Sequence, residues 1–217
     1  MKTITNEYKE KQDMANLCDT AITNCIKANC ENQMFSGVNP EALIANFNQI
    51  SGITWSQSNG NICTGITMGN DGATTPTDYC WFTVEQLGKE PFSGSQTELV
   101  EGTYGNKFTN TITLAVPDNG PEVCHDIIDQ LANGKFVVLI QNDYVHTNGD
   151  NKYQLFGAKK GLRCTAMTRE FYGDNNSYYI VTLTEENAPI SGAFFYVTDE
   201  STTDSAVAAL KCTCSNN

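Results

Sequence analysis

One run of apolar residues constrains the fold of this 217-residue chain more than any other feature. The segment 135–143 has the sequence KFVVLIQND, in which the residues from Phe136 to Ile140 are all apolar. Successive side chains of a strand point to opposite sides, so a short continuous apolar run is typical of a strand buried on both faces. The sequence therefore predicts a strand that other elements cover on both sides.

A second strand is predicted from strict alternation. In FTNTITLAV, residues 108–116, the apolar residues Ile112, Leu114 and Val116 alternate with threonine and alanine, which indicates one buried face. The segment 88–107 is predicted to be mostly connection, because Pro91 and several glycines disfavour a central strand. Further strands are expected within 41–55, 61–68, 79–87, 177–186 and 190–197.

The segment PDNGPEVCHDIIDQLANG, residues 117–134, has the pattern of a helix. Pro121 suits the first turn of a helix, and a glycine ends the segment. Val123, Ile127 and Leu131 follow the spacing i, i+4, i+8, so we expect one apolar stripe that packs on the sheet.

The segment KYQLFGAKKGLRCTAM, residues 152–167, has the pattern of two extended stretches joined by a tight turn at 159–161. We interpret it as a hairpin with Leu155, Leu162 and Met167 inward and basic residues near the turn. The segment contains no obvious catalytic group, so its expected role is shape and edge pairing.

About eight strands around one internal helix predict a mainly β fold, an antiparallel β-sandwich or partly open barrel with extended terminal arms. We divide the chain into a polar N-terminal arm at 1–36, a β-sandwich domain at 37–198 and a C-terminal tail at 199–217. The tail is expected to be loosely ordered, with a helical turn or two at most within 206–210.

The balance of charge limits the function classes. The formal net charge is −12, from 13 Lys and Arg against 25 Asp and Glu. An acidic surface repels phosphate, which disfavours a sequence-specific nucleic-acid reader and suits solubility. No run approaches the roughly 20 apolar residues of a membrane helix. The first residues, MKTITNEYKEKQDMANL, have no apolar core, so neither membrane insertion nor a secretory signal is expected.

The chain has nine cysteines, an odd number, and with no secretory signal we expect all of them to be reduced thiols. Cys25, Cys30, Cys212 and Cys214 could in principle form a zinc site that joins the two ends of the domain. Neither pair has the CxxC spacing of a zinc knuckle, so we expect no metal.

The sequence also lacks a catalytic constellation. Its two histidines are His125 and His146, and Cys124 and His125 are neighbours on a predicted helix, where adjacent side chains point about 100° apart. The stretch GDNNSYYIVTLTEE resembles a calcium loop in its acids but lacks the glycine at the sixth loop position. Glu185 and Glu186 are interpreted as a solvated edge. We therefore expect no enzyme, no catalytic residues and no cofactor.

The order of these segments is similar to that of a family. NPEALIANFNQISGITW, GSQTELVEGTYGNKFTNTITLAV, DIIDQLANGKFVVLIQND and KYQLFGAKKGLRCTAMTREFYGDNNSYYIVTLTEENAP follow one another over residues 38–190. This arrangement resembles tail-tube-like and tail-barrel ring proteins of Bacteroidetes phages, including crAss-like phages. Both ends of the chain depart from that pattern.

The resemblance implies a tail-tube-like β-sandwich that assembles into a homo-oligomeric ring in a phage tail, as tube or tail-barrel adaptor. The implied partners are other copies of itself, neighbouring tail or portal-adaptor proteins, and DNA that passes without specific binding. The implied location is the virion, after synthesis in the host cytoplasm. The alternative is a monomeric β-sandwich binding module, either immunoglobulin-like or carbohydrate-binding.

Overall fold

The computed structural model describes residues 37–73, 78–86, 88, 90–103, 105–117, 120–172 and 177–212. The expected N-terminal arm at 1–36 lies outside these residues, as do residues 213–217 of the expected C-terminal tail.

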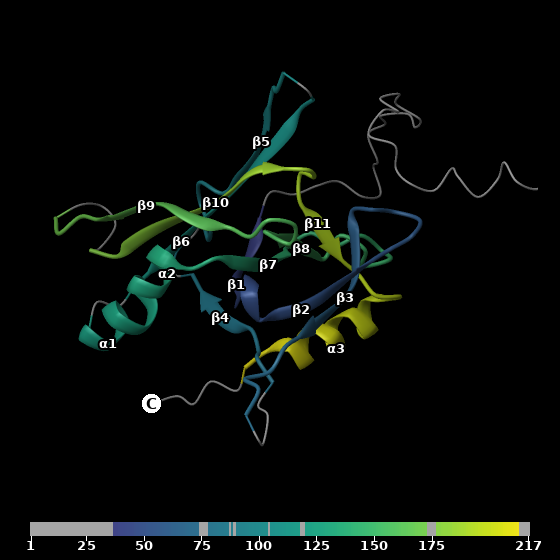
Figure 1. Ribbon diagram of the computed structural model, residues 1–217, viewed down its shortest axis with the longest axis horizontal. Coiled ribbons are helices and arrows are strands. Elements are labelled where there is room, and N and C mark those ends of the chain that lie inside the picture. The colour runs from purple at the N-terminus through teal and green to yellow at the C-terminus, as the bar shows by residue number, and fades with distance from the viewer. Residues whose placement is uncertain are drawn as a thin grey trace, which may run out of the picture.

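Within the described residues, eleven strands form two open sheets (Figure 1). The larger sheet has the strand order β2-β3-β11-β8-β7-β1-β4, and the smaller sheet has the order β5-β6-β10-β9. The strands of the larger sheet are β1 (Val38–Asn46), β2 (Ile50–Trp55), β3 (Ile62–Met68), β4 (Phe82–Glu85), β7 (Phe136–Asn142), β8 (Tyr153–Phe156) and β11 (Ala193–Phe195). Those of the smaller sheet are β5 (Gln96–Val100), β6 (Lys107–Val116), β9 (Arg163–Arg169) and β10 (Tyr179–Ala188). The expected mainly β, sandwich-like fold is confirmed.

Strand β7 lies inside the larger sheet and is buried on both faces, as its apolar run predicted. All five residues from Phe136 to Ile140 are buried. Phe136, Val138 and Ile140 belong to one core cluster, whereas Val137 and Leu139 belong to another. The larger sheet is therefore the middle of three layers.

The first core fills the space between the two sheets. Ile112, Leu114 and Val116 of β6 point into it, which confirms the alternation read from the sequence. Val181 and Leu183 of β10 join them opposite β7.

The second core lies on the opposite face of the larger sheet, beneath helix α3 (Glu200–Leu210) (Figure 1). Trp81 and Phe195 are fully buried in it, and Val207 and Leu210 of α3 pack against them. The expectation of a loosely ordered tail is thus wrong for this segment.

Three polar features order α3 that apolar periodicity alone did not indicate. The Asp199 carboxylate caps the helix by accepting a hydrogen bond from the backbone N–H of Thr202 at 2.8 Å. Thr203 is fully buried; its hydroxyl donates to the Asp199 carbonyl at 2.7 Å and accepts from the Val197 N–H at 3.1 Å. The Lys152 ammonium, at the start of β8, binds both acids of the first helical turns, Glu200 and Asp204, each at 2.8 Å.

The helix after β6 forms where expected but with a different buried face. It consists of α1 (Pro121–Val123), the π-helical turn η2 (Cys124–Ile128) and α2 (Asp129–Asn133). A π-turn holds one more residue than an α-turn, so the face that follows it shifts by one position. Ile128 and Leu131 are therefore buried, while Ile127 is 43% exposed. The predicted i, i+4, i+8 stripe is wrong at its middle residue.

The segment 152–167 is not a hairpin. Strand β8 pairs with β7 and β11 in the larger sheet, whereas β9 pairs with β10 in the smaller sheet. The turn between them carries the chain from one sheet to the other, and Gly157 permits this because a Cβ there would lie 2.6 Å from the Phe136 carbonyl oxygen. Leu155 and Leu162 are buried as predicted, but they belong to different cores.

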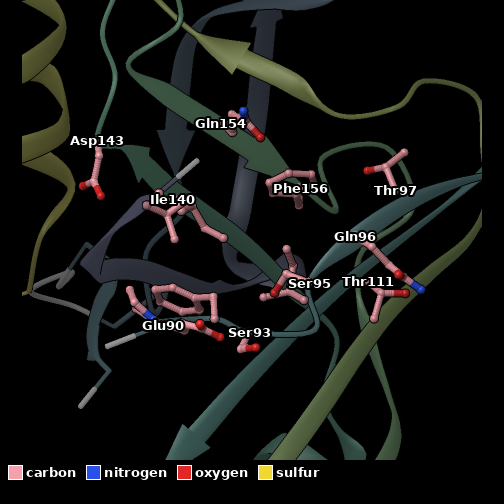
Figure 2. Close-up of a pocket in the computed structure, with 15 residues that line it drawn as sticks. Glu90, Ser93, Ser95, Gln96, Thr97, Thr111, Ile140, Asp143, Gln154 and Phe156 are labelled. Carbon is pink, nitrogen blue, oxygen red and sulfur yellow. The ribbon is translucent and has the colours of Figure 1, made fainter. Parts of the chain in front are cut away.

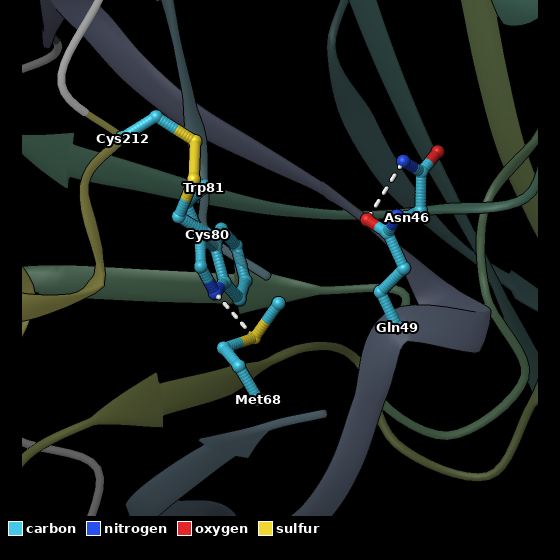
Figure 3. The surroundings of a disulfide bond; sticks show 6 residues. All are labelled: Asn46, Gln49, Met68, Cys80, Trp81 and Cys212. Carbon is cyan, nitrogen blue, oxygen red and sulfur yellow. Dashed lines mark hydrogen bonds between the residues drawn. A yellow bond between two sulfur atoms is a disulfide. The ribbon is translucent and has the colours of Figure 1, made fainter. Parts of the chain in front are cut away.

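A disulfide joins Cys80 to Cys212, so the expectation of nine reduced thiols is wrong for this pair (Figure 3). It fixes the end of α3 beside Trp81, whose N–H donates to the Leu210 carbonyl and whose carbonyl accepts from the Cys212 N–H, both at 2.8 Å. The Trp81 indole in turn donates to the sulfur of Met68 at 3.2 Å. The pairing was not foreseen because 132 residues separate the two cysteines.

Two adjacent isoleucines test the register of the π-turn. Ile128→Ala should lower the free energy of unfolding by about 2–5 kcal/mol, since it leaves a cavity in the core. Ile127→Ala should cost less than about 1 kcal/mol, because this side chain already meets solvent. Denaturant unfolding followed by circular dichroism measures both. Equal losses would contradict the shifted face.

The disulfide is tested by alkylating the denatured chain without reductant and analysing its peptides by mass spectrometry. Cys80 and Cys212 should stay linked, while the thiols of Cys63, Cys124 and Cys164 react. Replacing both linked cysteines by serine should lower stability by about 2–5 kcal/mol, because the long closed loop no longer restricts the unfolded chain. Full alkylation of both cysteines before reduction would show that the bridge is absent.

Candidate assembly surface

The smaller sheet ends in two strands, β5 and β9, that have no described partner on their outer side. Each of its three pairings is antiparallel. Strands β5 and β9 therefore run in opposite directions at opposite edges. Free edges present unpaired N–H and C=O groups, which proteins normally cover or blunt.

Strand β5 is exposed along its whole length and projects beyond the body of the molecule (Figure 1). It is held by pairing with β6, and Leu99 and Val100 are 58% and 40% exposed. Its only charged residue is Glu98, and Glu101 follows directly. This edge is thus acidic, with apolar side chains in solvent.

The sequence interpretation assigned β5 to a connection, which is wrong. Strand β5 has no buried face, so it lacks the apolar alternation that marks β6. The signal that could have revealed it is the following turn, where Gly102 and Gly105 lie just before the clear strand at 107–116. A short loop with glycines before a periodic strand is typical of a hairpin.

Strand β9 forms the opposite edge and is basic. Arg163 and Arg169 are its two ends, and it contains no acidic residue. Arg169 donates to the Ser177 carbonyl at 3.1 Å, and its guanidinium lies 4.8 Å from the centre of the Phe171 ring. Beyond this point Tyr172 is fully exposed.

The outer face of the smaller sheet, away from the first core, is mostly threonine. On β9 and β10, the Thr165 and Thr184 hydroxyls bond each other at 2.8 Å. The other threonines of this face, placed by the strand registers, are Thr109, Thr111, Thr113, Thr168 and Thr182. This face offers hydroxyl groups and few charges.

The end of β6 that extends beyond its pairing with β5 differs from the edges of β5 and β9, because side chains bond its backbone groups. Where β5 no longer pairs with it, the buried Gln86 side chain accepts from the Ala115 N–H at 2.8 Å and donates to the Ala115 carbonyl at 3.0 Å. The Ser95 hydroxyl oxygen accepts from the Thr113 N–H at 2.9 Å. Side chains thus satisfy this edge and leave β5 and β9 as the open ones.

A buried polar network holds the smaller sheet to the turn between β8 and β9. Glu185 is buried, accepts from the Lys160 N–H at 2.8 Å and accepts from the Asn110 amide at 3.1 Å. The side-chain oxygen Oδ1 of Asn110 accepts a hydrogen bond from the Thr97 hydroxyl at 2.9 Å. Interpreting Glu185 as part of a solvated edge was wrong, while Glu186 is exposed.

The structure does not join the other candidate residues into a reactive site. His125 is exposed and lies 2.6 Å from the Asp126 carboxylate, which raises the pKa of His125 through this hydrogen bond. The Cys124 sulfur lies 3.9 Å from the Tyr179 hydroxyl, so the two neighbours contact different partners. His146 bonds the Asp150 carboxylate at 2.9 Å.

The candidate metal ligands are also not brought together among the described residues. The sulfur of Cys212 is in the disulfide, and Cys25, Cys30 and Cys214 lie outside the described residues. Residues 179–186 of the calcium-loop candidate belong to strand β10, and 173–176 are not described. Among the described residues, no group of three or more His, Cys, Asp or Glu side chains is placed to hold a metal ion.

No family model matches this chain, and the comparisons with curated proteins and with solved structures give no significant match. In the described part of the chain, no helix has the length and apolar character needed to cross a membrane.

The capping role of Gln86 is open to test. Gln86→Ala should lower the free energy of unfolding by about 1–3 kcal/mol, because it leaves the partly buried N–H and C=O of Ala115 without their Gln86 partner. Gln96→Ala is the matched control: within the part of the chain that the structure describes, its amide bonds the exposed Glu98 side chain alone, so the change should stay within about 0.5 kcal/mol. Similar losses from the two variants would show that Gln86 does not cap β6.

Proposed function

We propose that this protein is the subunit of a closed homo-oligomeric ring in which β9 of one copy pairs with β5 of the next. The observation that carries the proposal is that the smaller sheet has two open edges of opposite charge. The acidic edge contains Glu98 and the basic edge contains Arg163. Both residues belong to the outer face, since their cross-strand partners are Thr109 and Thr184.

The strand directions support the same contact. Because neighbouring strands of the sheet alternate in direction from β5 to β9, a copy related by rotation presents β5 antiparallel to β9. The ladder would then continue without a break from subunit to subunit. Such a contact is heterologous, and it closes into a ring when the rotation divides a full turn.

Pairing also explains the exposed apolar residues of β5. A two-stranded projection with no core is marginally stable in water. A neighbouring strand would remove Leu99 and Val100 from solvent and satisfy the backbone groups of the edge. Cross-strand pairs of opposite charge add about 0.2–1 kcal/mol each, and this term recurs at every interface.

In such a ring the threonine face of the smaller sheet is suited to line the bore. Threonine hydroxyls hydrogen-bond water and carry no charge to hold phosphate. With a net charge of −12, the subunit suits a conduit through which DNA passes without binding. Because the threonine face carries few carboxylates, such a bore would be hydroxyl-lined and not strongly acidic.

By the resemblance of its segment order, we propose a place for this ring in a bacteriophage tail, as tube or tail-barrel adaptor. Its partners there would be further copies and neighbouring tail or portal-adaptor proteins. The protein would then be a structural virion component, made in the host cytoplasm. The alternative is a monomeric β-sandwich binding module.

Charge reversal at the two edges tests the ring. Glu98→Arg and Arg163→Glu should each weaken self-association at least severalfold, because each places like charges across the β5–β9 contact. An equimolar mixture should recover assembly, since the reversed edges are complementary. Analytical ultracentrifugation over a wide concentration range gives the species present.

Glu122→Arg, on helix α1, is the matched control: it makes the same change in charge away from both edges and should assemble normally. A wild-type chain that stays monomeric near 24 kDa at high concentration would overturn the ring and favour the binding module. Assembly that is insensitive to both reversals would place the contact elsewhere on the molecule.

A further inference from the structure

A cleft of about 580 Å³ lies at one end of the sandwich, beside the C-terminal end of strand β7 (Figure 2). Helix α2 leads into the opposite end of this strand. The walls of the cleft come from both sheets and from the segment before β5. Its volume is within the range of small-molecule sites in proteins. The lining residues used below are Glu90, Phe92, Ser93, Asp143, Gln154 and Phe156.

The most informative group in the cleft is the side chain of Gln154. Tyr153 and Leu155 point into the second core, so the alternation of β8 directs Gln154 and Phe156 toward the first core. In the ladder Gln154 lies between Ile140 and Phe194. Its amide forms no side-chain hydrogen bond with the described residues. Gln154 is half-buried and its amide is not among buried atoms without a partner, so it meets solvent in the cleft and can bond water or a ligand there.

Carboxylates and a hydroxyl extend this polar wall. Asp143 follows β7, and Gly37 leaves room for it, since a Cβ at Gly37 would lie 2.5 Å from an Asp143 carboxylate oxygen. Glu90 and Ser93 line the other side. These three side chains also form no hydrogen bond with the described residues, so acceptors and donors remain available.

The cleft also has an apolar wall. Phe156 is partly buried against the first core, and Phe92 is buried nearby with a φ of 57°. A positive φ is unusual for a bulky residue and costs energy that the surroundings must offset. The turn is held by the Ser95 N–H, which donates to the Phe92 carbonyl at 3.0 Å. The strained turn thus keeps an aromatic ring beneath a polar cleft.

The charge of the lining limits the ligand. Among the described residues, no Lys, Arg or His lines the cleft, whereas Glu90 and Asp143 do. The charged groups that an anion would meet among them are therefore carboxylates. Planar amide and carboxylate groups pair well with vicinal hydroxyls, and an aromatic ring packs against the C–H face of a sugar.

We propose that this cleft binds a neutral polyhydroxylated ligand, a saccharide unit. Gln154, Asp143 and Glu90 would bond its hydroxyls, and Phe156 would contact its apolar face. The lining shares Gln96 and Thr97 with strand β5 but includes no residue of β9, and the saccharide contacts proposed here use no residue of either edge strand.

The test uses the full chain, labelled with ¹⁵N and followed by two-dimensional NMR. The probes are glucose, N-acetylglucosamine, maltose, cellobiose and lactose, each titrated to tens of millimolar. At least one should give saturable shifts of the amide signals around Gln154, Asp143 and Ser93. Glucose 6-phosphate should bind at least tenfold more weakly than the neutral sugar, and Asp143→Asn should reduce that difference. Glucosamine serves as the cationic probe and should not exceed the best neutral sugar by more than a few fold.

Gln154→Leu, which nearly keeps the side-chain volume, should weaken binding at least fivefold. The matched control is Gln130→Leu on helix α2, which should bind as the unchanged protein does. If Gln154→Leu does not fold, Asp143→Asn and Ser93→Ala provide the same comparison at the cleft rim. The proposal is overturned if no neutral saccharide gives saturable shifts, if glucose 6-phosphate binds as tightly, or if glucosamine is strongly preferred.

Discussion

The double burial of β7 is the constraint on which the rest of the structure depends. Its side chains enter two different cores in alternation, so neither face of the larger sheet can be left open. Each buried aliphatic side chain contributes about 1.5–3 kcal/mol, which requires a covering layer on both sides. The smaller sheet covers one face and α3 covers the other. Helix α3 is therefore part of the fold, which is why an N-cap, two ion pairs and a disulfide hold it in place.

Polar side chains solve the problem that the two open sheets create at their junctions. Where β6 has no strand beside it, Gln86 replaces the missing backbone partner and also binds the larger sheet through its own N–H and the Pro40 carbonyl. Where the chain crosses from β8 to β9, the buried Glu185 carboxylate binds the backbone of the crossing turn. Both groups replace ladder hydrogen bonds that two separate sheets cannot supply.

The sequence was most informative where burial is regular. The continuous run of β7 and the alternation of β6 predicted their environments correctly, because strand periodicity translates directly into exposure. Prediction from the sequence failed where one extra residue in a helical turn, or a contact between residues far apart in the chain, determines the structure. The π-turn moved the buried face from Ile127 to Ile128, and no local pattern marks such a turn. The Cys80–Cys212 pairing, the transfer of β9 to the second sheet and the cleft around Gln154 all depend on tertiary contacts.

The charges of the open edges bear on what kind of assembly this fold allows. Charged residues on an edge strand normally prevent association, and the larger sheet also uses a four-residue edge at β4 and register shifts at β2. On the smaller sheet the two edges carry opposite signs. Pairing β5 with β5, or β9 with β9, would juxtapose like charges and disfavour a twofold dimer, whereas β5 with β9 would not. The same charges that oppose pairing of each edge with its own kind would favour the head-to-tail contact of the proposed ring, in which β5 and β9 of every copy are paired.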